Sequence, residues 1–175
     1  MQVDHLQKTL KHLDVGPASY KVLKLLPLVY VAWVEGKLTP ERAIRIIDLA
    51  HNHFQIGADG ERVLRGWLNH RPDPGYFLEG LHDIVLLAYA PDEWGFDVDE
   101  LPGLLAHAEA IARTTPAEMD APTAVTTAEN RALAEIAREL GVDRGESWCE
   151  LMHELERGPR VMAPRSRSAA GPPSQ

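Results

Sequence analysis

The sequence is poor in cysteine and has no long apolar run. Cys149 is the only cysteine among 175 residues, so the chain can form neither an internal disulfide nor a zinc knuckle built from several thiolates. The most apolar uncharged stretch, Leu25 to Val34, has ten residues, whereas a membrane-spanning helix needs about 20. Residues 1–14 carry charges throughout and lack the apolar stretch of a secretory signal. We therefore expect a cytoplasmic protein with no membrane span.

Positive charge is also scarce outside the C-terminal residues. The net charge is −8, and without the four arginines between residues 157 and 167 it is −12, with 14 basic against 26 acidic residues. A body of this charge repels phosphate backbones, which argues against a nucleic-acid partner. The arginine-bearing tail is expected to make at most a weak contact with an anionic surface.

Apolar residues recur at helical spacing, and no segment has the alternating pattern of a strand. The sequence predicts an all-α bundle of eight helices, over about residues 3–13, 18–34, 39–54, 59–69, 76–89, 104–113, 127–140 and 145–155. The second helix is apolar on every side and is therefore the expected central helix, with Pro27 kinking or restarting it. Gly57 is expected to leave the third helix in the left-handed conformation.

One domain is expected over residues 1–157, followed by a disordered tail over residues 158–175 that is rich in Pro, Ser, Ala, Gly and Arg. Two of the predicted helices resemble each other, because Arg42–Ile47 and Arg131–Ile136 can be overlaid at an offset of 89 residues. A duplication into halves at about 18–90 and 101–156 would explain the overlay. Well-capped amphipathic helices also resemble one another for purely physical reasons.

Two segments resemble TerB-like tellurite-resistance domains. Leu28 to Glu41 is similar to that family's apolar helix, acidic-glycine turn and Thr-x-Glu helix start. Thr126 to Asp143 resembles its closing signature, an amphipathic helix ending in Ile-Ala-x-x-Leu-Gly. The resemblance covers about residues 18–156. It implies a duplicated helical bundle with a non-enzymatic role in tellurite or other chemical stress, or as a scaffold, that acts by binding a partner protein.

The same resemblance implies metal-binding acidic turns, as some members have. The first turn offers Glu35 and Glu41 as candidate ligands for a hard cation, although Lys37 lies between them. The equivalent stretch of the second half, residues 114–126, has only two acidic residues, Glu118 and Asp120. We therefore expect no resident cofactor, with a divalent cation at this turn as the alternative.

Two Glu-x-x-His pairs, Glu79 with His82 and Glu150 with His153, have the spacing found in di-iron helical bundles. They define the alternative function, a metal-dependent helical-bundle enzyme. Such a site also needs a glutamate from each of two further helices. The simpler interpretation of both pairs is an exposed polar helix face.

The acidic link between residues 92 and 100 contains the candidate partner-binding residues Trp94, Phe96, Asp97 and Asp99. Two aromatic side chains among carboxylates can anchor a protein partner. Alternatively, both rings fold back into the core while Asp97 or Asp99 caps the next helix. His51 and His53 lie on different sides of a helix and are expected to be surface residues.

Overall fold

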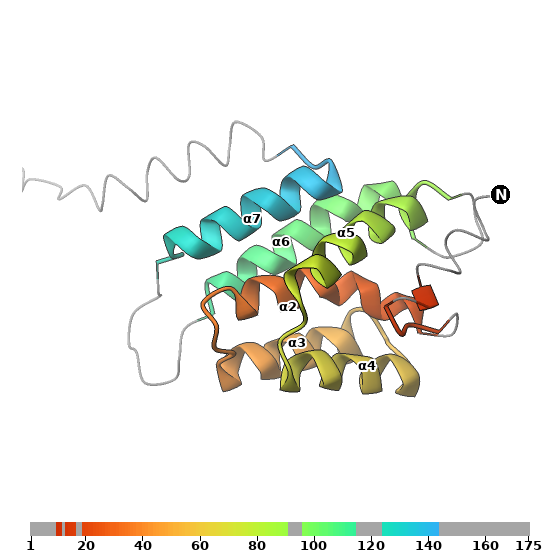
Figure 1. Cartoon of the computed structure of the whole chain (residues 1–175), viewed down its shortest axis with the longest axis horizontal. Helices are drawn as coiled ribbons and strands as arrows, with labels where there is room; N and C mark the ends of the chain where they lie inside the picture. The colour runs from red at the N-terminus through yellow and green to blue at the C-terminus, as the bar shows by residue number, and fades with distance from the viewer. Residues whose placement is uncertain (1–9, 12, 17–18, 91–95, 115–123, 144–175) are drawn as a thin grey trace, which may run out of the picture. The chain divides into compact units, whose positions relative to one another are not determined.

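The computed structural model describes residues 10–11, 13–16, 19–90, 96–114 and 124–143. This part of the chain is helical and includes no strand, so the all-α prediction is confirmed (Figure 1). It has two 3-10 helices and six α-helices: η1 (Tyr20–Leu25), α2 (Leu26–Trp33), α3 (Pro40–Asn52), α4 (Ala58–Asn69), α5 (Pro74–Ala88), η2 (Val98–Glu100), α6 (Leu101–Ala112) and α7 (Thr127–Leu140). The helix expected over 145–155, most of that over 3–13, and the tail lie outside the described residues.

Helix α2 is the centre of this arrangement, as its apolar sequence predicts. It contacts η1, α3, α5, α6 and α7, and it packs against α6 more extensively than against any other described element (Figure 1). Leu26, Leu28, Val29 and Val31 have no solvent-exposed surface. Pro27 lies in the first turn, where its missing N–H costs no hydrogen bond, and the α-helix restarts here after the 3-10 helix η1.

Helix α5 approaches α2 closely at Gly80. A Cβ atom placed on Gly80 would lie 2.1 Å from Cδ2 of Leu26, so no larger residue fits without moving that side chain. On the α7 side of α2, the hydroxyl of Tyr30 donates a hydrogen bond to the carboxylate of Glu135. Burial, followed by this hydrogen bond, raises the pKa of Tyr30 to about 12.

The helix starts follow the predicted caps. The Thr39 hydroxyl accepts a hydrogen bond from the Arg42 amide at 3.4 Å, and Thr126 forms a capping box with Glu129. Gly141 ends α7 with φ of 64°. The prediction for Gly57 is wrong: its φ is −77°, and the left-handed residue after α3 is Gln55, with φ of 50°.

A buried ion pair joins the N-terminal turns of α3 and α7. Arg42 is 6% exposed and Glu129 is 1% exposed, and the guanidinium donates to the carboxylate through Nη2. The same Nη2 donates at 3.1 Å to the carbonyl of Ala112, the last residue of α6. Arg42 therefore holds both the end of α6 and the beginning of α7.

The caps of α3 and α7 match at a different offset from the sequence overlay. Arg42 and Glu129 are each the third residue after a capping threonine, and they lie 87 positions apart rather than 89. At this offset buried Ile46 corresponds to buried Leu133, whereas the overlay of 89 placed buried Arg42 on exposed Arg131. The two helices are thus alike in their buried positions, and the duplication itself stays a prediction.

No helix in the described ranges combines the length and the apolar character required to cross a membrane.

Candidate functional site: a basic pocket at α3 and α6

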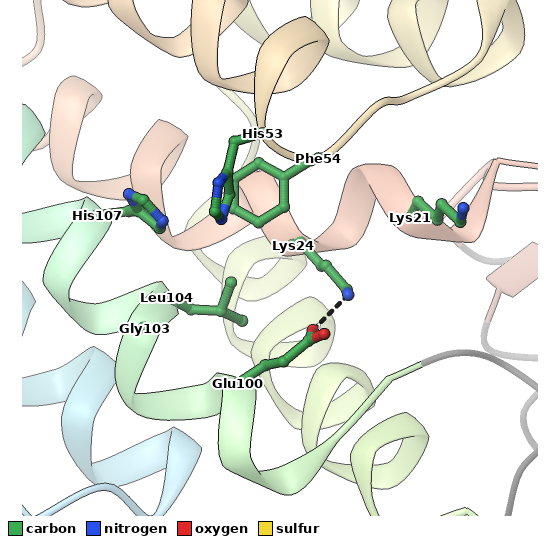
Figure 2. A pocket seen from close by; sticks show the side chains of 8 residues that line it. All are labelled: Lys21, Lys24, His53, Phe54, Glu100, Gly103, Leu104 and His107. Carbon is green, nitrogen blue, oxygen red and sulfur yellow. Dashed lines mark hydrogen bonds and ion pairs between the residues drawn. The ribbon is translucent and has the colours of Figure 1, made fainter.

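A cavity of about 470 Å³ lies beside η1, at the end of α3 and along the first two turns of α6 (Figure 2). The lining side chains are mostly basic or aromatic, with one carboxylate: Lys21, Lys24, His53, Phe54, Glu100, Gly103, Leu104 and His107. This volume is within the range of about 300–1,000 Å³ that is usual for small-molecule sites. The cavity is therefore large enough for an organic ligand.

Three rings form one wall of the pocket. His53, the residue at which α3 ends, faces His107 of α6, with ring centroids 4.7 Å apart and an interplanar angle of 62° (Figure 2). Phe54 packs edge-on against both, with its centroid 4.7 Å from that of His53 and 5.5 Å from that of His107. These contacts fix the direction in which the two imidazoles face.

The two histidines differ in their surroundings. His53 is exposed, whereas His107 is half-buried. Burial lowers the pKa of His107 below its usual value, and the neighbouring His53 and Arg45 lower it further because positive charge disfavours the imidazolium. Near neutral pH, His107 is therefore a neutral imidazole with a nitrogen lone pair.

The lysines of η1 have different roles. The Lys24 ammonium is paired with the Glu100 carboxylate across the pocket, as Figure 2 shows, and lies 4.7 Å from the centre of the Phe96 ring. Lys21 is exposed at the rim. Within the described part of the chain, no ion pair is formed by Lys21 or by Arg45.

The candidate partner-binding residues do not form one exposed patch in the described chain. Phe96 is only 8% exposed and packs against Tyr20, with ring centroids 5.9 Å apart, so its ring is part of the core. Asp97 caps η2 by accepting a hydrogen bond from the Asp99 amide at 3.0 Å. Trp94 lies outside the described residues. The alternative in which the link folds back holds for Phe96, whereas Asp97 caps the 3-10 helix η2 and α6 itself begins after Glu100 without a side-chain cap.

The candidate metal ligands are also dispersed. Glu35 is exposed in the turn after α2, and Glu41 is in the first turn of α3. Glu79 and His82 are both exposed on α5, while Glu150 and His153 lie outside the described residues. Among the residues that the structure describes, no three His, Cys, Asp or Glu side chains form a group able to hold a metal ion.

Sequence reasoning missed the pocket because its residues come from elements far apart in the chain. It considered His53 together with His51, but His51 lies 3.4 Å from the Glu61 carboxylate of α4. It did not consider His107, Lys21 or Lys24. The available signal was the position of His107 in a segment whose neighbouring residues are leucine and alanine.

Comparison of the chain with protein-family models, with curated proteins and with solved structures finds no match. The resemblance to TerB-like domains therefore stays a prediction from the sequence.

Proposed function

We propose that this protein is a non-enzymatic, TerB-like binding module with a scaffold role or a role in the response to tellurite or other chemical stress. Its binding face is the one that carries the basic pocket. The observation that carries this proposal is the pairing of Glu100, the carboxylate of the pocket, with Lys24. A carboxylate held by an ammonium is a poor general base, whereas the remaining basic and aromatic side chains are suited to binding.

The test compares two charge reversals in a strain that lacks the gene. Lys21→Glu changes the pocket rim, and Lys37→Glu makes the same change in the exposed turn after α2. Growth of the deletion strain on tellurite should be impaired, and the wild type and Lys37→Glu should restore it while Lys21→Glu should not. Normal growth of the deletion strain under tellurite and other oxidative chemicals would remove the stress role. Equal rescue by both variants would contradict the assignment of the binding role to the face that carries the pocket.

Elemental analysis of the purified protein separates this function from a metal-dependent enzyme. A stoichiometric transition metal that is lost in Glu79→Ala or His82→Ala would contradict the binding module. The exposed positions of both side chains on α5 give no support to such a site.

A further inference from the structure

We infer that His53 and His107 together bind one divalent transition-metal ion, such as Cu(II) or Ni(II), with water from the pocket completing its coordination. The two residues come from the end of α3 and from α6, and both line the cavity. The inference goes beyond the proposed function, because the two imidazoles can hold the ion whichever partner the protein recognises.

The distance between the two rings is that of two imidazoles bound to one ion. A metal at about 2.0–2.1 Å from a ring nitrogen lies about 3.2 Å from the ring centroid. Two imidazoles bound at 90° around the ion then have centroids about 4.5 Å apart, and at the tetrahedral angle about 5.2 Å. The centroids of His53 and His107 are 4.7 Å apart, and Figure 2 shows nitrogen atoms of both rings on the sides that face each other. This separation favours the square-planar or octahedral coordination of Cu(II) or Ni(II) over tetrahedral Zn(II).

The two imidazoles are held in place by their own surroundings. Phe54 packs edge-on against His53 at 4.7 Å and against His107 at 5.5 Å, measured between ring centroids. The amides of His53 and Phe54 both donate to the Leu49 carbonyl at 3.0 Å, which fixes the end of α3. His107 is half-buried in the middle of α6. Metal binding therefore has to immobilise little that is not already ordered.

Charges of both signs surround the pocket, so ligand chemistry rather than net charge selects the ion. Lys24 and Glu100 are paired, and Lys21 lies at the opposite end of the pocket, beyond this pair (Figure 2). The other charged side chains on the adjoining turns are Arg45, Asp48, Asp97, Asp99 and Glu109. A hard ion such as Ca(II) prefers several carboxylate oxygens, whereas Cu(II) and Ni(II) prefer imidazole nitrogen.

The remaining coordination positions are open. Among the described residues, no third His, Cys, Asp or Glu joins the two imidazoles in a group able to hold a metal ion. The adjacent cavity of about 470 Å³ has room for the water molecules that fill these positions. The affinity therefore depends on two protein ligands, and losing either one should weaken it strongly.

Calorimetric titration of the full chain with Cu(II), Ni(II), Zn(II) and Ca(II) tests the choice of ion. The first equivalent of Cu(II) should bind most tightly, and electron paramagnetic resonance of the Cu(II) protein should show two nitrogen ligands. Absence of Cu(II) binding at submillimolar concentration, or a Cu(II) spectrum without nitrogen ligands, would overturn the inference. Tighter binding of Zn(II) or Ca(II) than of both Cu(II) and Ni(II) would do the same.

Two variants with matched controls locate the site. His53→Gln and His107→Gln should each weaken binding of the first Cu(II) by about tenfold or more. His51→Gln on α3, which removes the partner of Glu61, and His82→Gln on α5 should leave the affinity unchanged. His53 is exposed, so its replacement tests the site even if His107→Gln disturbs folding. An unchanged Cu(II) affinity in His53→Gln, or an equal loss in His51→Gln, would overturn the assignment.

These results are independent of the test of the proposed function. Cu(II) binding that requires both pocket histidines, together with full stress rescue by Lys21→Glu, would retain the metal site and contradict the proposed binding face. Failed rescue by Lys21→Glu, together with a Cu(II) affinity that does not depend on His53, would retain the proposed function and contradict the metal site.

Discussion

Replacing Arg42 by methionine should destabilise the protein far more than removing an exposed ion pair. The change leaves the Glu129 carboxylate, which is 1% exposed, without its cation, and it also leaves the Ala112 carbonyl without its donor. The remaining hydrogen bond to this carboxylate comes from the Thr126 amide at 2.9 Å. Breaking one side of a buried ion pair costs about 3–5 kcal/mol. That is a large fraction of the roughly 5–15 kcal/mol by which domains are usually stable.

A double-mutant cycle separates the ion pair from the packing around it. Glu129→Gln keeps an oxygen for the Thr126 amide, and combining it with Arg42→Met removes both charges. We expect the double variant to be at least about 2 kcal/mol less destabilised than the sum of the single variants, because no buried charge is left unpaired. Urea unfolding followed by the helical circular dichroism signal measures the free energies of unfolding of the wild type and the three variants.

The matched control is Arg65→Met, which breaks the exposed pair of Arg65 with Glu61 on α4. Exposed pairs contribute about 0–1 kcal/mol, so this variant should unfold at nearly the urea concentration of the wild type. Either of two results would refute the reasoning: an Arg42→Met variant no less stable than Arg65→Met, or strictly additive free energies in the cycle.

Three further predictions concern single groups. Gly80→Ala should destabilise the protein by about 1–3 kcal/mol because the added Cβ would contact Leu26. Gly66→Ala on α4, where an added Cβ has no neighbour within 4 Å, should stabilise the protein by about 0.5–1 kcal/mol. Thermal unfolding of both variants shows whether stability decreases in the first and increases in the second. Tyr30 should ionise near pH 12 in the folded protein and near pH 10 in the unfolded chain, so the free energy of unfolding should fall as the pH rises through that interval. Absorbance titration of the wild type and Tyr30→Phe measures the ionisation of Tyr30, and a single tyrosine transition near pH 10 would contradict the prediction. The pKa of His107 is lower in the folded protein than in the unfolded chain, so the free energy of unfolding should decrease as the pH falls below about 6.5. Urea titrations at several pH values should show a smaller decrease for His107→Gln, and an equally steep decrease in the variant would contradict the assignment.

The features that were predictable from the sequence are those determined by a few neighbouring residues. Thr39 and Thr126 indicated two helix starts, because a capping hydroxyl bonds to amides within its own turn. The uncharged run around Val29 indicated a central helix, because only a surrounded helix is apolar on every side. The error at Gly57 has a local cause as well: Gln55 already takes the left-handed conformation, so the glycine is free to be extended.

The candidate site could not be predicted in the same way. His53 and His107 lie on α3 and α6, and their contact depends on how both helices pack against α2. Phe96 lies among acidic residues in the sequence, which is typical of an exposed aromatic anchor. In the structure its ring is buried, because it packs against Tyr20 and lies beside the Lys24 ammonium. The comparison of α3 with α7 shows the same limitation. Identical residue types align the two helices at an offset of 89 residues, whereas their buried positions align at an offset of 87 residues.

The central position of α2 has a consequence for synthesis of the chain. This helix is complete once Trp33 has been made, but α6, its most extensive neighbour, begins only at Leu101. During translation, the most apolar segment of the protein must therefore wait for about 70 further residues before its principal packing surface exists. We expect nascent chains that end before α6 to bind chaperones, and release of the chain to coincide with the arrival of α6 and α7 rather than with completion of α2.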